Sequence, residues 1–228
     1  MFDGKFRTGV DKAVKPVGAA LRKTGLTPDH LTVLGLLVGI GATVAIGSGR
    51  LLLGLVLVIL AALPDLFDGA LAKASDTASQ RGAFFDSTVD RLTDALLLGG
   101  IAWYLASEES PHMALLPFAV MAVSSIISYQ RAKAESLGID AKGGLMERAE
   151  RIIAICLGLL IPVLLIPILW IMLVLTSITA VQRFVKVWKQ AAVAPVTAAR
   201  IEMRRSRRQS RRVARTERRR TRVPRRPR

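Results

Sequence analysis

Long apolar segments separated by short polar ones make up most of the chain between residues 27 and 190. A helix that crosses a bilayer needs roughly 20 apolar residues, and the segments have about that length. Thr27 and Pro28 begin the first one with a capping hydroxyl and a proline suited to the first helical turn. We therefore predict helices over residues 29–47, 51–74, 82–106, 112–136, 147–166 and 168–189.

The boundary between the last two predicted helices can be drawn in more than one place. Pro162 and Pro167 both interrupt the apolar stretch, and proline ends or kinks a helix when it lies in the interior. The residues around Pro167 are taken as the turn.

Composition supports a membrane protein. Hydrophobic residues form 51% of the 228-residue chain, and the mean hydropathy is +0.40. The expected fold class is an all-α integral membrane protein with six transmembrane helices over residues 27–190. The single cysteine, Cys156, lies inside an apolar run and is expected to be a small core residue.

The first 26 residues differ from the rest because charged and apolar positions alternate at helical spacing. We predict an amphipathic juxtamembrane helix over residues 1–26 that lies on an anionic membrane surface. The alternative is a solvated helix packed on the membrane domain.

The charge of the chain is concentrated at its C-terminal end. Residues 200–228 hold 15 arginines against two glutamates, out of a net charge of +16. We predict a disordered, arginine-rich cytoplasmic tail over residues 191–228 that binds anionic membrane lipids. Nucleic acid is the alternative partner, but the tail has no aromatic residues to stack on bases, so no nucleic-acid role is expected.

The distribution of lysine and arginine predicts the topology. Six spans place both termini on one side, and the connections on that side carry nearly all the basic residues. The positive-inside rule then predicts a multi-pass protein of the cell membrane with both termini in the cytoplasm. His112, on the opposite side, is expected to be a solvated loop residue.

Four aspartates lie at the cytoplasmic ends of the second and third predicted helices: Asp65, Asp68, Asp86 and Asp90. Spacings of three and four residues place each pair on one helix face. Crowded carboxylates need cations, and such hard oxygen ligands suit Mg²⁺ or Mn²⁺. Two ions can be accommodated.

The alternative is a set of structural carboxylates that pair with neighbouring bases, namely Lys73, Arg81 and Arg91. Asp94 continues the face of the second pair by one turn, and we expect it to pair with a basic residue. Asp76, in the polar connection, is expected to be solvated.

The aspartates form part of a longer pattern, D-x2-D-G-x2-A-R-x8-G-x3-D-x3-D. The residues that match it are Asp65, Asp68, Gly69, Ala72, Gly82, Asp86 and Asp90, and Lys73 occupies the arginine position. This segment closely resembles the CDP-alcohol phosphotransferase family. Lysine keeps the positive charge but lacks the bidentate fork of arginine.

The resemblance implies a six-helix membrane fold, usually dimeric, with two divalent ions bridged by Asp65 and Asp86. It places Asp68 on one ion and Asp90 on the other, with Asp90 also the general base. It further implies CDP-diacylglycerol as donor and CMP as leaving group. The residues it assigns to the donor are Asp29, His30, Leu31, Thr32, Gly69, Lys73 and Ser79.

Downstream segments, 127–135, 143–151 and Val181–Arg183 with Trp188, resemble the actinobacterial phosphatidylinositol phosphate synthases. In these the acceptor is inositol 1-phosphate. A phosphorylated acceptor needs a second cationic site apart from the metals. The candidates are Arg131, Lys133, Arg148, Arg151 and Arg183; the alternative is that they anchor the helix ends at lipid headgroups.

The predicted function is therefore transfer of the phosphatidyl group of CDP-diacylglycerol to inositol 1-phosphate, giving phosphatidylinositol phosphate and CMP. One alternative acceptor is glycerol 3-phosphate, which would give phosphatidylglycerol phosphate. Two further alternatives are a divalent-cation channel or carrier, and a non-catalytic membrane anchor whose basic tail recruits an acidic partner.

Overall fold

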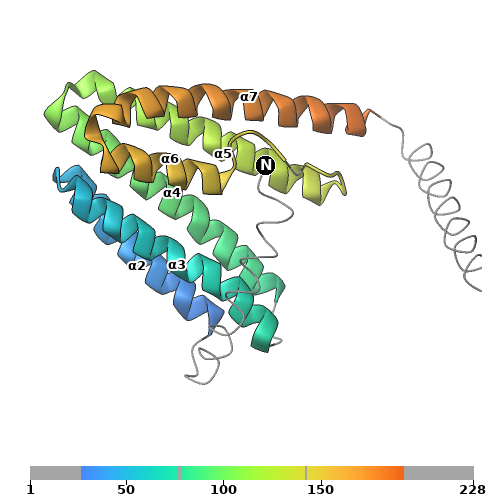
Figure 1. Ribbon diagram of the computed structural model, residues 1–228. Coiled ribbons are helices and arrows are strands. Elements are labelled where there is room, and N and C mark those ends of the chain that lie inside the picture. The colour runs from blue at the N-terminus through green and yellow to red at the C-terminus, as the bar shows by residue number, and fades with distance from the viewer. Residues whose placement is uncertain (1–26, 76–78, 142, 193–228) are drawn as a thin grey trace, which may run out of the picture.

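The structure is a computed structural model that describes residues 27–75, 79–141 and 143–192, without the side chains of Pro28 and residues 64–75. These residues contain helices and no strands (Figure 1). The α-helices are α2 (Pro28–Gly47), α3 (Leu51–Ser75), α4 (Gln80–Glu108), α5 (Leu115–Ser136), α6 (Arg148–Leu160) and α7 (Leu165–Ala191). The predicted N-terminal helix and arginine-rich tail lie outside the described residues, apart from Ala191 and Ala192.

All six predicted helices are present, and the errors are at their ends. The last two helices separate at a 3-10 turn, Pro162–Leu164, and not at Pro167. Pro167 lies in the first turn of α7, where its missing N–H has no helical partner to lose. A second 3-10 turn, Pro111–Ala114, precedes α5, which begins later than predicted.

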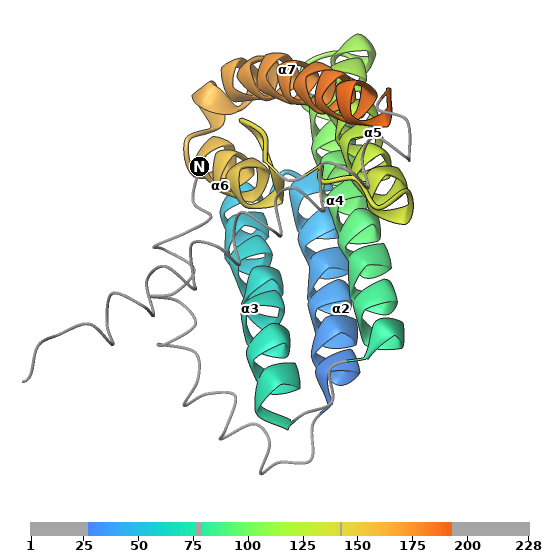
Figure 2. The same ribbon diagram turned by 90° about the vertical axis from the view of Figure 1, so that its right-hand side faces the viewer.

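The helices form two groups, which meet where α4 packs on α5 and where α3 packs on α6. In one group α2 packs against both α3 and α4; in the other α5 and α6 pack on α7, and α4 also contacts α5. Figure 2 shows α2, α3 and α4 side by side, with α6 and α7 beyond their upper ends. One continuous core connects the groups, including Ile46, Leu97, Leu105, Leu159 and Leu169.

Small residues let α2 and α4 approach closely. On α2 they are Gly39, Thr43 and Gly47, four residues apart, a spacing common at helix contacts in membranes. A Cβ added at Gly100 of α4 would lie 2.8 Å from the carbonyl oxygen of Thr43. A Cβ added at Gly47 would lie 2.0 Å from the Trp103 ring. Any larger residue at either glycine would force the helices apart.

Among the residues that the structure describes, three segments are long and apolar enough to span a bilayer: Asp29–Gly47, Pro111–Ser136 and Pro162–Ala191. The apolar part of α3, Leu51–Leu63, is shorter, and α6 has only 13 residues. Many large apolar side chains are exposed on these helices, among them Leu37, Leu52, Phe118 and Ile171. The all-α membrane class is thus confirmed, whereas the number of spans stays a prediction.

Candidate active site

Three aspartates follow one face of α4, at Asp86, Asp90 and Asp94. The spacing of four residues places them one above another. The side chain of Asp90 is 16% exposed and that of Asp94 is 10% exposed, so both carboxylates are largely removed from water. Carboxylates in this position require positive partners.

Two arginines in the first turns of α6 supply these partners. Arg148 donates from Nη1 to Asp90 at 2.8 Å and from Nε to Asp94 at 3.3 Å. Arg151 pairs with the other oxygen of Asp94 at 2.6 Å. The expectation that Asp94 pairs with a basic residue is confirmed. Because Arg151 is only 4% exposed, the cation and its carboxylate are buried together.

The metal-ligand prediction involves both α3 and α4. Asp65, Asp68 and Lys73 lie on α3 with Gly69, and the three side chains are outside the described part of the structure. Among the side chains that are described, no three carboxylate, histidine or cysteine groups lie close enough to hold one ion. The carboxylates of Asp86 and Asp90 lie on adjacent turns of α4, and such oxygen donors match the chemistry of Mg²⁺ or Mn²⁺.

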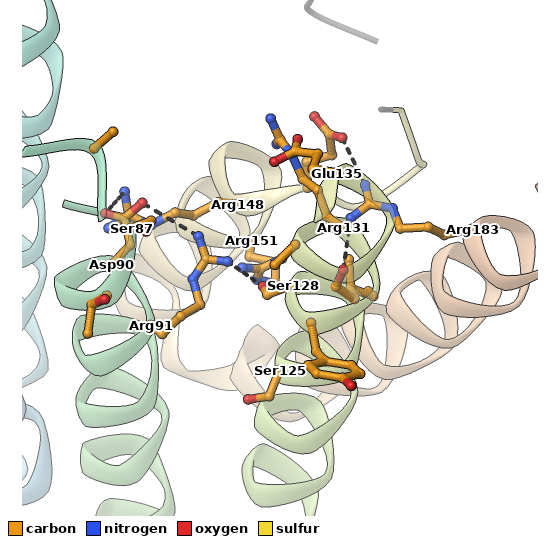
Figure 3. A pocket seen from close by; sticks show the side chains of 16 residues that line it. Ser87, Asp90, Arg91, Ser125, Ser128, Arg131, Glu135, Arg148, Arg151 and Arg183 are labelled. Atoms are coloured by element: carbon orange, nitrogen blue, oxygen red, sulfur yellow. Dashed lines mark hydrogen bonds and ion pairs between the residues drawn. The ribbon is translucent and has the colours of Figure 1, made fainter. Parts of the chain in front are cut away.

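A cavity of about 810 Å³ opens beside Asp90, between α4, α5, α6 and α7 (Figure 3). Its charged lining residues are Asp90, Arg91, Arg131, Glu135, Glu147, Arg148, Arg151 and Arg183. Five arginines against three acids give the wall a positive excess. Four of the five predicted acceptor-site residues therefore meet in one cavity. Lys133 is exposed on α5 and does not line it.

Arg183 crosses from α7 to the other elements of the cavity wall. Its guanidinium donates to the carbonyl oxygens of Ile127 and Gly143, each at 3.0 Å, and to Glu147 at 3.2 Å. Its Nε is buried without a hydrogen-bond partner. Arg183 thus holds α5 and the segment before α6 against α7 at the cavity wall.

Thr179, one turn before Arg183, holds the segment that leads into α6. Its fully buried hydroxyl accepts from the backbone N–H groups of Leu145 at 3.2 Å and Met146 at 3.1 Å. Gly143 has a φ of +94°, a left-handed conformation that favours glycine. A Cβ at Gly144 would lie 2.4 Å from Cγ2 of Thr179. This packing fixes where α6 begins and so positions Arg148 and Arg151 in its first turns.

Five of the residues predicted for the donor lie where α2 and α4 begin, namely Asp29, His30, Leu31, Thr32 and Ser79; Gly69 and Lys73 lie on α3. Thr27 and His30 form a capping box at the start of α2, and the Ser79 hydroxyl caps α4 through the N–H of Gly82 at 3.0 Å. A Cβ at Gly82 would lie 3.7 Å from a carboxylate oxygen of Asp29. The two helix starts are therefore adjacent. Leu31 and Thr32 are buried there.

Several cavity residues were not predicted from the sequence. Arg91 donates to the Ser128 hydroxyl and also lies 3.6 Å from Asp90. The second contact is of the kind that the alternative of structural carboxylates paired with neighbouring bases predicted. The others include Ser87, Thr88, Ser125, Glu135 and Glu147. Ser87 lies three residues before Asp90, on the same helix face, and this spacing could have revealed it.

Comparison with known proteins agrees with this geometry. The family model for CDP-alcohol phosphatidyltransferase matches residues 25–192. The chain belongs to this family. The phosphatidylinositol phosphate synthase of Mycolicibacterium smegmatis is 33% identical over 187 residues, covering 78% of this chain and 84% of the relative. That of Streptomyces avermitilis is 34% identical, covering 82% and 83%.

Solved structures of phosphatidylinositol phosphate synthase also resemble this chain. Mycobacterium tuberculosis phosphatidylinositol phosphate synthase with CDP-DAG bound matches with a TM-score of 0.73 and 30% identity, covering 78% of this chain and 94% of that one. The same mycobacterial enzyme in complex with manganese and citrate matches with a TM-score of 0.72 and 31% identity, covering 77% and 88%.

Proposed function

We propose that the chain is a phosphatidylinositol phosphate synthase, which transfers the phosphatidyl group of CDP-diacylglycerol to inositol 1-phosphate. The observation that carries this proposal is the arginine-rich cavity beside Asp90. A transferase acting on an uncharged alcohol would not need a cavity of this charge. Relatives of the same name, at 33% and 34% identity, support the choice.

The acceptor phosphate is proposed to bind to Arg131, Arg148, Arg151 and Arg183. Arginine presents paired N–H donors that match phosphate oxygens, and these four line the cavity. Lys133, outside the lining, contributes long-range attraction only. The acceptor is thereby held with its hydroxyl toward Asp90.

In the proposed reaction, the acceptor hydroxyl oxygen forms a bond to the phosphorus nearer the lipid. The bond from that phosphorus to the bridging oxygen breaks, and CMP leaves with that oxygen. The carboxylate of Asp90 takes the hydroxyl proton as general base. Since Arg148 donates to Asp90, the carboxylate is oriented before the acceptor arrives.

Asp65, Asp68, Asp86 and Asp90 would hold two Mg²⁺ ions, with Mn²⁺ an alternative. When bound, such ions neutralise the diphosphate and polarise the phosphorus that is attacked. The donor's cytidine diphosphate is assigned to the neighbouring starts of α2 and α4 and to the last turns of α3. The residues are Asp29, His30, Leu31, Thr32, Gly69, Lys73 and Ser79.

We propose six membrane spans with the cavity at the cytoplasmic face of the cell membrane and both termini in the cytoplasm. Trp170 and Trp188 of α7 are both exposed, and their separation of about 27 Å along a helix approaches the thickness of the hydrocarbon layer. Tryptophan favours both membrane interfaces. The remaining proposals are an amphipathic helix over 1–26, a homodimer, and a tail over 191–228 that binds anionic lipid.

The test is an acceptor comparison on purified protein with Mg²⁺ and CDP-diacylglycerol. Release of CMP should rise on adding inositol 1-phosphate and should fall when the divalent ion is chelated. Glycerol 3-phosphate, supplied alone, should be a poor substrate. A preference for glycerol 3-phosphate would identify a phosphatidylglycerol phosphate synthase, and no CMP release with either acceptor would contradict both assignments.

A further inference from the structure

Five hydroxyl side chains line the cavity, on α4 and α5: Ser87, Thr88, Ser125, Ser128 and Tyr129. Ser87, Thr88 and Ser125 each donate a proton to a carbonyl oxygen of their own helix. Ser87 and Thr88 donate to Phe84 at 2.9 and 2.8 Å, and Ser125 donates to Met121 at 2.9 Å. All three residues are exposed, so the lone pairs of their hydroxyl oxygens are accessible from the cavity.

A hydroxyl whose proton is already donated acts toward a ligand as an acceptor. Such a group suits an alcohol O–H and does not suit a phosphate oxygen, which has no proton to give. Ser128 differs from the other three because it already accepts from Arg91 while donating to Ser124. Tyr129 also lines the cavity and is exposed, but its hydroxyl is phenolic. Ser87, Thr88 and Ser125 are therefore the aliphatic hydroxyls open to a ligand.

The arginines of the cavity have the reverse character. They lie on all four helices that line it and offer only donors: Arg91, Arg131, Arg148, Arg151 and Arg183. A phosphate is best served by these side chains. Figure 3 shows Ser87 and Asp90 on α4 and Arg183 on α7, with Arg91 and Arg131 lining the same cavity.

We propose that Ser87, Thr88 and Ser125 read the hydroxyl groups of the acceptor and so select a polyol phosphate over a smaller alcohol phosphate. This inference rests on the proposed function. Inositol 1-phosphate carries more free hydroxyls than glycerol 3-phosphate, and only the former can use all three side chains. Ser87 lies three residues before Asp90 on α4. The acceptor hydroxyl that attacks and the acceptor hydroxyls that bind these side chains would therefore lie on the same side of the cavity.

The experiment measures KM for inositol 1-phosphate and for glycerol 3-phosphate in the variants Ser87→Ala, Thr88→Val and Ser125→Ala. One lost hydrogen bond should raise KM for inositol 1-phosphate about three- to tenfold and change KM for glycerol 3-phosphate far less. KM for CDP-diacylglycerol should not change. Ser136→Ala is the matched control, since Ser136 also donates to its own helix, at 2.7 Å to Lys133, but does not line the cavity.

A second measurement uses inositol 1-phosphate analogues that each lack one ring hydroxyl. At least one analogue should lack the very hydroxyl that one of the three side chains binds. For that analogue, the corresponding variant and the unchanged protein should have equal KM, because the hydrogen bond is absent in both cases. Equal effects on both acceptors, or no effect of any of the three substitutions, would overturn the inference while leaving the proposed function intact. Failure of the unchanged protein to use inositol 1-phosphate would instead overturn the proposed function, and this inference with it.

Discussion

Helix α4 makes two contacts of opposite kinds. Toward α2 its later turns carry Gly100 and Trp103, and the two backbones nearly touch. Toward α6 its earlier turns carry Asp90 and Asp94, which meet Arg148 and Arg151 through ion pairs. The first contact is close-packed and uncharged, and the second is charged and adjoins a large cavity.

The difference separates rigidity from chemistry along one helix. Close packing of small residues depends on shape and tolerates no added volume. Arginine side chains have several donors and can bind a ligand while keeping a protein partner. The close-packed contact therefore keeps α4 in place, and the charged contact can respond to the acceptor.

The most damaging change on the charged side should be Asp90→Asn. Removing the proposed base is expected to lower kcat about 10²- to 10⁴-fold, with little loss of folded protein, measured as CMP release with inositol 1-phosphate. Asp140→Asn is the control, since Asp140 is an exposed carboxylate in the α5–α6 connection. Activity of Asp90→Asn near that of the control would contradict the assignment.

On the close-packed side, Gly100→Leu should destabilise the fold. Its Cβ would meet the backbone of Thr43, and overpacking of this kind costs about 1–3 kcal/mol. The thermal midpoint of the purified protein should fall by several degrees. Gly99→Leu is the neighbouring control, because an added Cβ there meets nothing within 4 Å. Equal midpoints for the two variants would show that the contact is looser than described.

A milder change on the charged side is Arg151→Lys, which keeps the charge beside Asp94 but removes the paired donors. KM for inositol 1-phosphate should rise about tenfold, with KM for CDP-diacylglycerol unchanged.

Lys133→Gln should have a smaller effect that disappears in high salt, since Lys133 is exposed outside the cavity. The opposite ranking would place the acceptor nearer α5.

The smallest effect is expected at an exposed ion pair outside both contacts. Lys186 lies 3.3 Å from Asp140, and both side chains are largely exposed. Lys186→Ala should therefore change the free energy of unfolding by less than about 1 kcal/mol, with no change in KM for the acceptor. A larger loss in a denaturation experiment would mean that the α5–α6 connection depends on this pair.

Apolar periodicity was sufficient to predict the helices, and carboxylate spacing to predict one acidic face. The boundary at Pro167 was wrong because proline is tolerated in a first turn. Lys133 lies outside the cavity that Arg131 lines, and the sequence pattern did not separate the two.

Other parts of the site depend on which helices meet. Asp94 accepts a hydrogen bond from Arg151, which is 57 positions away in the chain. Arg183 donates to the carbonyl oxygen of Ile127, 56 positions away. No local pattern specifies such pairs. The hydroxyl side chains of the cavity were missed for a similar reason, because serine and threonine on a membrane helix carry no distinctive signal until a cavity is present.

The contact between Gly144 and Thr179 has a consequence for genetics. Because a methyl group at position 144 would collide with Cγ2 of Thr179, Gly144→Ala should behave as a loss-of-function allele. Thr179→Ser removes that methyl carbon while keeping the hydroxyl that accepts from Leu145 and Met146. The second allele should thus suppress the first, and the two positions are expected to vary together in evolution.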